Sequence, residues 1–509
     1  MKNVNQDNKQ RIASNYFFNL AYQIFCIVIP LITTPYLARI LTSSGVGQFS
    51  YATSISSYFV LFAMLGFNIY AQREIAAIHE DKKKQSLLFW EIVIAKIITS
   101  AIAISIYLGL VFFNVFGIDY KLFLLILIIN VSSSFFDITF FFQGKEKFKI
   151  IAIRNSIFRI ISLVLVFVFV KRESDLWIYF LCYSIPTLIA AVSLWLHLPK
   201  MLCKVSIKHL NIKRHFLPSI KLFVPTLAIS VYTLLDKTLI GILVPGTVSI
   251  LGNDGVEVIK KMADIENGYY GQSEQIVKIA LTIISSLGTV MIPRNTTLIS
   301  QGCIDEFREN VSDAFRFVFL IGTPIMLGLA AIAFNFSPWF FGGGYEKVPY
   351  LIIFLSPLIL IIGLSNVLGI QVLLPLKKDK EYIISICCGA VINLIANILL
   401  IPILYSYGAV IATIVAEAVV TIMMLIFARK QNITFSKILL ESWRCFVSGL
   451  IMFCFVLVLQ MFLKPKPIDT FILIIEGIVI YFSFLSIFRE PFISRFSSYF
   501  NFKRKNSNL

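Results

Sequence analysis

The stretch YIISICCGAVINLIANILLIPIL, residues 382–404, carries no charged side chain. A bilayer hydrocarbon core about 30 Å thick is crossed by about 20 apolar residues of α-helix, so this stretch is long enough to span a membrane. The loop directly before it is basic, with Lys377, Lys378 and Lys380 close together. An apolar span that follows a basic loop is the pattern from which the fold of the whole chain can be predicted.

Apolar stretches of similar length fill most of the sequence. Of the 509 residues, 58% are hydrophobic and 14% are charged, and the mean hydropathy is +0.84. We therefore expect an all-α polytopic membrane protein with about 14 transmembrane helices. The predicted spans are residues 16–38, 46–71, 87–113, 121–142, 151–170, 176–198, 218–244, 272–293, 314–334, 349–371, 382–404, 407–428, 443–463 and 468–488.

Lysine and arginine are concentrated in alternate loops. Most of the 45 basic residues lie in loops on the same side as the N-terminus, and the opposite loops hold few. Because basic loops stay in the cytosol, we expect both termini to be cytosolic. The net charge of +17 then follows from topology, with anionic lipid as the counter-surface, and no nucleic-acid partner is expected. The eight cysteines avoid the expected external loops and the four histidines are scattered, so neither disulfides nor a metal site is expected.

The two halves of the chain share features at corresponding positions. These are a proline in the first helix of each half, a glycine at the entry to the second helix, and a Leu-Gly pair near its end: Pro30 and Pro225, Gly47 and Gly271, Leu65-Gly66 and Leu287-Gly288. The offset is 224 residues at the glycine and 222 at the Leu-Gly pair. Chance similarity of apolar segments is the alternative, but a parallel repeat is typical of two-lobed transporters. We expect an N-lobe of helices 1–6 (residues 1–198), a cytosolic linker (199–217), a C-lobe of helices 7–12 (218–428), and helices 13–14 with a basic cytosolic tail (429–509).

Several ionisable residues fall inside the predicted spans. They are Lys96, Asp137, Arg159, Asp236, Lys237, Lys278, Glu417 and Glu476. Each would cost on the order of 3 kcal/mol near the bilayer centre unless it meets a partner or a wet cavity. Cations at several depths favour a cavity for a phosphate-bearing substrate, because Lys and Arg are the side chains that pair with phosphate. Neutralisation of these charges in pairs between helices is the alternative.

Several segments resemble a known family. They are Pro30–Leu41 with Gly45–Tyr51, Asn68–Ala76, Phe142–Gly144 with Glu146 and Arg154-Asn155, Leu235–Gly241 and Val290–Arg294. Together they are similar to bacterial polysaccharide and O-antigen flippases of the Wzx type. These form the polysaccharide-transport branch of the multidrug/oligosaccharidyl-lipid/polysaccharide (MOP) exporter superfamily. The resemblance covers roughly the first 430 residues.

The resemblance implies a fold of two pseudo-symmetric six-helix lobes plus a C-terminal helix pair in a bacterial cell membrane. It implies a flippase rather than an enzyme. Such a protein moves undecaprenyl-diphosphate-linked oligosaccharide from the cytosolic to the outer leaflet by alternating access, for surface polysaccharide such as capsule or O-antigen. The partners it implies are that lipid-linked substrate, membrane lipid and other surface-polysaccharide assembly proteins.

The resemblance also assigns roles to residues of this chain. By the family's cationic lumen, Lys96, Arg159, Lys237 and Lys278 are candidates for substrate binding. The carboxylates Asp137, Asp236, Glu417 and Glu476 are candidates for coupling to a proton or sodium gradient, or for salt bridges within the cavity. The helix-end residues Arg39, Arg73 and Arg294 are candidate gates or topological anchors. No catalytic residue, metal or cofactor is expected.

Two other functions are weighed against the flippase. A multidrug exporter of the same superfamily usually has an acidic residue in its first helix, and Tyr16–Ala38 contains none. A membrane-embedded polysaccharide polymerase or glycosyltransferase usually needs a large external loop, and the longest here, Pro245–Gly271, has only about 27 residues. This loop is either a short surface helix over the cavity mouth or an insertion. The sequence lacks a GxxxxGK[ST] pattern, so ATP hydrolysis is not expected.

Overall fold

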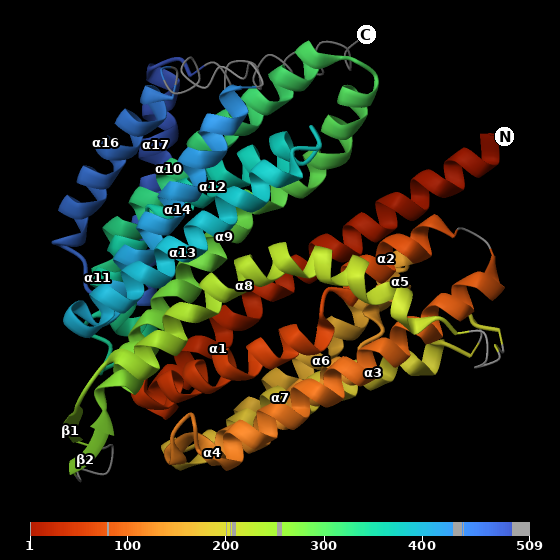
Figure 1. Ribbon diagram of the computed structural model, residues 1–509. Coiled ribbons are helices and arrows are strands. Elements are labelled where there is room, and N and C mark those ends of the chain that lie inside the picture. Colours follow the sequence, from red (N-terminus) through yellow and green to blue (C-terminus); the bar gives the residue numbers. More distant parts are fainter. Residues whose placement is uncertain are drawn as a thin grey trace. The chain divides into compact units, whose positions relative to one another are not determined.

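The computed structural model describes residues 2–78, 81–199, 201–203, 205, 210–251, 257–430, 440 and 442–490. Within these ranges the side chains of residues 2–24, 231–232, 249–251, 257–259 and 286–294 are left out of the description. The described chain is almost entirely helical (Figure 1). By internal packing it divides into two compact units, Met1–Gly268 and Tyr269–Leu509.

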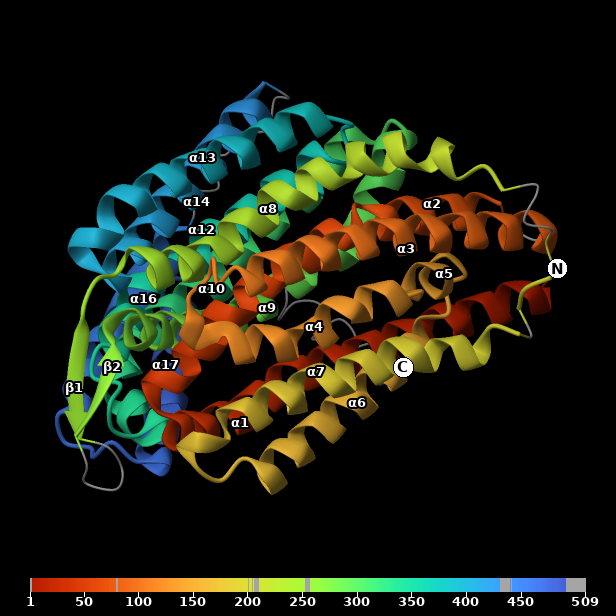
Figure 2. The same ribbon diagram turned by 60° about the horizontal axis from the view of Figure 1, so that its bottom comes forward.

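Helix α1 (Lys2–Met64) contains the first two predicted spans in one continuous element. A straight helix of 63 residues would be about 95 Å long, far more than one bilayer crossing requires. The element is interrupted at Thr42, which has a left-handed φ of 60° and an extended ψ of 175°. Both segments run between the end of unit 1 that carries the β-hairpin and the end that carries α2 and α5 (Figures 1 and 2). The break therefore returns the chain across the membrane.

The remaining helices of unit 1 pack around α1. They are α2 (Phe67–Ala77), α3 (Lys82–Phe112), α4 (Lys121–Phe136), α5 (Thr139–Gly144), α6 (Phe148–Phe169), α7 (Leu176–Ser193) and α8 (Phe216–Leu243). Short 3₁₀ turns occur at Ile118–Tyr120, Glu173–Asp175, Leu194–His197 and Ile212–His215. Helix α1 contacts α3, α4, α6 and α8, and α4 contacts α7. Because α8 packs on α1 and α2, it belongs to unit 1, whereas the repeat places it in the second lobe. The lobe boundaries predicted from the repeat stay a prediction.

The segment between α8 and α9 contains an antiparallel β-hairpin. Strand β1 (Thr247–Leu251) pairs with β2 (Glu257–Lys261), with Val248 opposite Lys260. The sequence left open whether this loop is a surface helix or an insertion, and residues 247–251 and 257–261 form strands rather than a helix. The physical reason lies in the composition, since both strands are rich in β-branched residues. Helix α9 begins directly after β2, at Met262.

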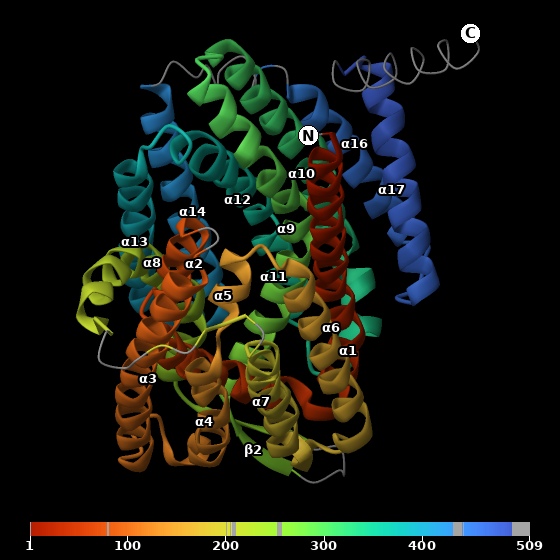
Figure 3. The same cartoon turned by 90° about the vertical axis from the view of Figure 1, so that its right-hand side faces the viewer.

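Unit 2 contains the rest of α9 (Met262–Ser300) and a second set of helices. These are α10 (Ile304–Phe341), α11 (Val348–Leu355), α12 (Leu358–Asn366) with a π-helical turn (Val367–Leu373), α13 (Asp379–Leu404), α14 (Ser406–Arg429), α16 (Trp443–Gln460) and α17 (Pro467–Ile487). Helices α13 and α14 pack together, and α16 and α17 pack on each other and on α10 (Figure 3).

The helices confirm the predicted polytopic fold. Eleven helices among the described residues are long and apolar enough to cross a membrane, or twelve if the bent α8 counts as one span. One of the eleven runs from Phe25 to Ala77 and contains two predicted spans, separated at Thr42. Helix α9 covers the predicted span 272–293. Each of the fourteen predicted spans thus coincides with a helix or with helices separated by a short turn.

Two glycines allow α1 and α9 to cross at very short distance. A Cβ on Gly47 would lie 1.6 Å from the Asp264 carbonyl oxygen, and a Cβ on Gly268 would lie 2.0 Å from that of Ser43. Small residues permit such backbone contact between membrane helices. The contact is reciprocal, since Ser43 with Asp264 and Gly47 with Gly268 both have an offset of 221 residues. On each helix the contacted carbonyl lies four residues before the glycine, so the two helices contribute equivalent positions to the crossing.

Candidate functional site

Two helix breaks in unit 1 meet at one lysine. The first separates α1 from α2 at Leu65-Gly66, where both residues have positive φ. The second separates α4 from α5 at Asp137-Ile138, where Asp137 adopts an extended backbone. Broken helices expose backbone polar groups, and membrane proteins tolerate these groups only where protein or a cavity satisfies them. Lys96, from the middle of α3, donates to a backbone carbonyl at the second break and to the side chain of Asn68 just after the first.

The ammonium of Lys96 is surrounded by oxygen atoms from both breaks. It donates to Asn68 Oδ1 at 2.9 Å and to the Asp137 carbonyl oxygen at 2.5 Å, and it lies 3.8 Å from Asp137 Oδ2. It also lies 5.4 Å from the centre of the Phe140 ring. The Lys96 side chain is only 1% exposed, and that of Asp137 is 15% exposed. Lys96 is thus the enclosed cation of a preformed oxygen cage.

The Asp137 carboxylate is also held by neutral donors. Oδ1 accepts from the Thr139 backbone N–H at 3.0 Å and from the Thr139 hydroxyl, and Oδ2 accepts from Asn68 Nδ2 at 2.9 Å. Asn68 therefore bridges the two charged groups with its two amide atoms. We refer to Asn68, Lys96, Asp137 and Thr139 as the buried lysine centre. Such a centre can keep a charge pair in the membrane and can change its hydrogen bonding if either helix break moves.

A second ionic cluster lies where α3 faces the segment that enters α8. Glu91 is fully buried and accepts from Arg214 at 2.6 Å, from the Asn211 backbone N–H at 2.6 Å, and contacts His215 Nε2 at 2.8 Å. His215 Nδ1 lies 2.9 Å from the Tyr70 hydroxyl. The sequence prediction missed Glu91, although it lies inside the predicted span 87–113 and a charge there was a usable signal. Its partners are more than 100 residues away in sequence and could not be predicted.

The four predicted substrate-binding cations have different environments. Lys96 is enclosed and bonded to Asp137, which is the pairing that the sequence left open as the alternative. Lys278 is 51% exposed and forms an ion pair of 2.6 Å with Glu274, one helical turn earlier. This partner was missed, although i,i+4 pairs of opposite charge are expected on helices. Arg159 and Lys237 are partly buried, and neither is without a partner. A cationic cavity built from all four stays a prediction.

The other candidate residues are distributed over both units. Asp236 and Glu417 are buried, and neither is without a partner. Glu476 is partly buried in α17, and its Oε2 has no hydrogen-bond partner among the described residues. Arg39 and Arg73 are exposed, whereas the side chain of Arg294 lies outside the described part of the chain. Their roles in coupling or gating stay predictions.

Solved structures with the same fold define the class of protein. The structure is similar to "Lipid II flippase MurJ, inward closed conformation", with a TM-score of 0.73 and 18% identity over 94% of this chain and 100% of that one. It is also similar to an inward-facing multidrug resistance MATE family transporter of the MOP superfamily, with a TM-score of 0.56 and 10% identity over 80% of this chain and 98% of that one. The fold is therefore that of the MOP superfamily.

The family follows from the sequence. A family model described as "Polysaccharide biosynthesis protein" matches residues 12–298, more than half of the chain, and the chain belongs to this family. It is 26% identical over 440 residues to the "Putative O-antigen transporter" of Escherichia coli (strain K12), covering 84% of this chain and 99% of that protein. Over a shorter region of 143 residues the chain is 22% identical to "Lipid II flippase MurJ" of Bacillus subtilis (strain 168), which covers 28% of this chain and 26% of that protein. The resemblance to polysaccharide flippases is confirmed.

Proposed function

We propose that this protein flips undecaprenyl-diphosphate-linked oligosaccharide from the cytosolic to the outer leaflet of a bacterial cell membrane, for the synthesis of a surface polysaccharide such as capsule or O-antigen. The relationship to an O-antigen transporter across almost its whole length supports this proposal. The observation that carries it in the structure is the buried lysine centre. It places a charged pair at two breaks of membrane helices, which is where transporters of other folds place their functional groups.

The proposed mechanism is alternating access. Cationic side chains bind the diphosphate on the cytosolic side, while the polyprenyl tail stays in the lipid. Arg159, nearer the predicted cytosolic face, is the proposed first contact, and Lys237 and Lys278, in the predicted outer half, are proposed to contact the substrate later in the cycle. Lys96 is enclosed in the conformation described here, so we propose that it leaves Asp137 for the diphosphate only when the helix breaks move. Both termini stay in the cytosol in this orientation, and other assembly proteins receive the glycan outside.

We further propose that a proton or sodium gradient drives the cycle through one of the buried carboxylates. Asp137 is the best placed among the described residues, because its carboxylate already binds one cationic group and three neutral donors. A coupling cation that entered the cage would compete with the Lys96 ammonium for the same oxygens. Export that is insensitive to the collapse of both gradients would contradict this part of the proposal.

The function is tested in a deletion strain. Lipid-linked oligosaccharide is extracted and identified by mass spectrometry, and its sidedness is measured in sealed cells with an external sugar-modifying enzyme. A complete repeat unit that accumulates and is shielded from the enzyme supports the flippase. Complete units that reach the outer face normally contradict it. A shortened unit would support the alternative of a membrane-embedded glycosyltransferase.

A further inference from the structure

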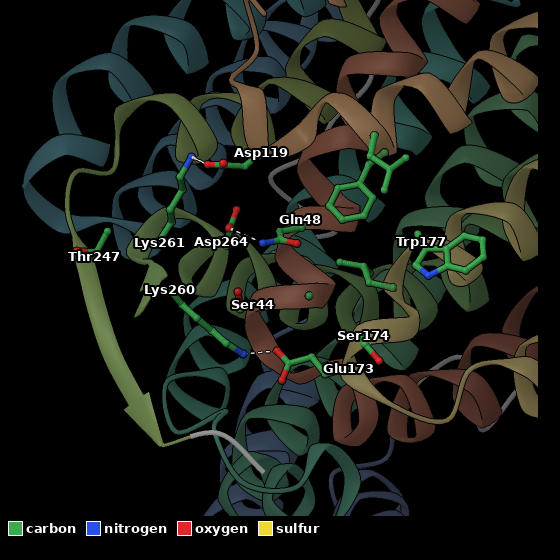
Figure 4. A pocket seen from close by; sticks show the side chains of 14 residues that line it. Ser44, Gln48, Asp119, Glu173, Ser174, Trp177, Thr247, Lys260, Lys261 and Asp264 are labelled. Carbon is green, nitrogen blue, oxygen red and sulfur yellow. Dashed lines mark hydrogen bonds and ion pairs between the residues drawn. The ribbon is translucent and has the colours of Figure 1, made fainter. Parts of the chain in front are cut away.

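A cavity of about 640 Å³ lies at the hairpin end of unit 1 (Figure 4). Its walls come from all four loops that the sequence predicts to be external among the first eight spans: Ser44 and Gly45, Asp119, Glu173 and Ser174, and the hairpin segment from Thr247 to Asp264. The volume falls within the range of small-molecule sites, about 300–1,000 Å³. We call this space the outer pocket.

The charges of the outer pocket are fixed and nearly balanced. Lys260 forms an ion pair with Glu173 and donates to the Thr42 hydroxyl at 3.1 Å. Lys261 forms an ion pair of 2.6 Å with Asp119. Each lysine of the hairpin is therefore bound to a carboxylate from another loop. A phosphate or an acidic sugar would find no excess of positive charge here.

A third carboxylate of the outer pocket is held by neutral donors. Asp264 Oδ1 accepts from the Tyr120 hydroxyl at 2.6 Å, and Oδ2 accepts from Gln48 Nε2 at 3.0 Å. Burial raises the pKa of the Asp264 carboxyl above its ordinary value, while these two hydrogen bonds act in the opposite direction. The wall thus presents the amide of Gln48, the hydroxyl of Tyr120 and the carboxyl of Asp264 in fixed orientations. Two lysine–carboxylate ion pairs lie close to them.

Apolar and aromatic groups complete the lining. Trp177 is 45% exposed, and Leu122 and Phe123 lie on the same cavity. An exposed indole beside a polar wall offers both a flat apolar face and nearby hydrogen-bonding groups. Sugars need this combination, because a sugar ring has apolar C–H faces and a rim of hydroxyls. A purely apolar ligand would leave the polar wall unsatisfied.

We propose that the outer pocket binds an uncharged sugar unit of the transported glycan on the extracytoplasmic side. This inference rests on the proposed function and deepens it, since it places a saccharide site away from the diphosphate-binding residues. The sugar ring stacks on Trp177, and its hydroxyls exchange hydrogen bonds with Gln48 and the paired charges of the hairpin. Binding there holds the glycan at the exit side after the head group has crossed.

The test uses photo-crosslinking in the full-length protein. Trp177→p-benzoylphenylalanine places a photoreactive aromatic group in the pocket in place of the indole. Membranes from cells that make the lipid-linked oligosaccharide are irradiated, and the peptide containing residue 177 is analysed by mass spectrometry. The matched control is Ile189→p-benzoylphenylalanine, on the same helix α7 and exposed but outside the pocket. If the first variant fails to fold, Leu122→p-benzoylphenylalanine takes its place.

The expected result is a glycan adduct at position 177 that is at least tenfold more abundant than at 189. It should fall several-fold when Gln48→Ala is added to the same chain. Equal adducts at both positions, or a phospholipid adduct in place of glycan, would overturn the inference. If position 177 gives no adduct while the deletion strain accumulates a shielded repeat unit, the proposed function stands and the saccharide site fails. Normal export in the deletion strain would instead overturn the function itself.

Discussion

Unit 1 contains lysine–carboxylate pairs in two contrasting settings. In the buried lysine centre, Lys96 and Asp137 are 1% and 15% exposed, and the polar groups around them come from Asp137 itself and from the first turns of α2 and α5. In the outer pocket, Lys261 and Asp119 are 42% and 56% exposed. The exposed pair has the shorter distance, 2.6 Å against 3.8 Å. Distance alone is therefore a poor guide to what a pair contributes.

The environment decides the contribution of each pair. Water and salt screen an exposed pair, which is worth about 0–1 kcal/mol. Removing one partner of a buried pair leaves an uncompensated charge, at a cost of about 3–5 kcal/mol. The inner pair is thus a strict structural requirement in this conformation, whereas the exposed Lys261–Asp119 pair mainly orients the pocket wall.

The largest effect is expected from Lys96→Met. The substitution leaves the Asp137 carboxylate buried without its cation, so we expect a loss of about 3 kcal/mol in stability and loss of surface polysaccharide. The double variant Lys96→Met with Asp137→Asn removes both charges and should recover most of the stability. Thermal unfolding of the purified protein and immunoblotting of the polymer measure the two effects.

The matched control for that prediction is Lys261→Met. Lys261 is paired with a carboxylate, like Lys96, but Lys261 and its partner Asp119 are both exposed, at 42% and 56%. Its removal should change stability by no more than about 0.5 kcal/mol. If both lysines gave equal losses of stability, the distinction between the two settings would be wrong.

The transmembrane fold could be predicted because a membrane-spanning helix is recognised from the length and apolarity of its own sequence, without knowledge of its neighbours. Length and apolarity define the spans, whereas the orientation inferred from the basic loops stays a prediction. The helix breaks were less visible. Gly66 permits a left-handed φ, but Asp137-Ile138 has neither glycine nor proline, and its extended backbone depends on contacts with Asn68 and Thr139.

The candidate site was predicted only in part. Charges inside spans indicated Lys96 and Asp137, and the structure brings these two side chains together. Which charge meets which depends on packing between α3 and the α4–α5 break, and a single sequence does not specify it. The hairpin shows the opposite case. Its β-branched residues favoured strands, but the sequence interpretation weighed only a surface helix or an insertion for this loop.

Glu91→Gln is expected to have the next largest effect. It keeps the size of the side chain but removes the charge that binds Arg214 and His215. Hydrogen bonds to charged groups contribute about 1.5–3 kcal/mol, so we expect a loss of about 2 kcal/mol. Faster proteolysis of the segment around residues 199–217 should accompany it, because Glu91 also fixes the Asn211 backbone. Unchanged stability and an unchanged rate of proteolysis would show that the buried Glu91 cluster contributes no more to stability than an exposed ion pair does.

Asp119→Asn should have a small effect. It breaks the exposed pair with Lys261, and we expect a stability change of less than about 0.5 kcal/mol. The difference from the wild type should disappear at about 1 M salt, where the screening length is about 3 Å. Melting temperatures in low and high salt measure this. A large loss that persists in salt would mean that the outer pocket is as strictly organised as the buried lysine centre.

The smallest effect expected is a dependence of the protein's stability on pH that arises from Asp264 in the outer pocket. Because burial raises the pKa of the Asp264 carboxyl in the folded protein, the folded state binds its proton more tightly than the unfolded state does. Stability should therefore rise as the pH falls through this raised pKa toward about 3.9, the ordinary value for aspartate. Asp264→Asn lacks this titration, so the melting temperature of the wild type minus that of the variant should increase from pH 8 to pH 4.5. A difference that is constant, or that decreases over this range, would show that the hydrogen bonds from Tyr120 and Gln48 outweigh burial.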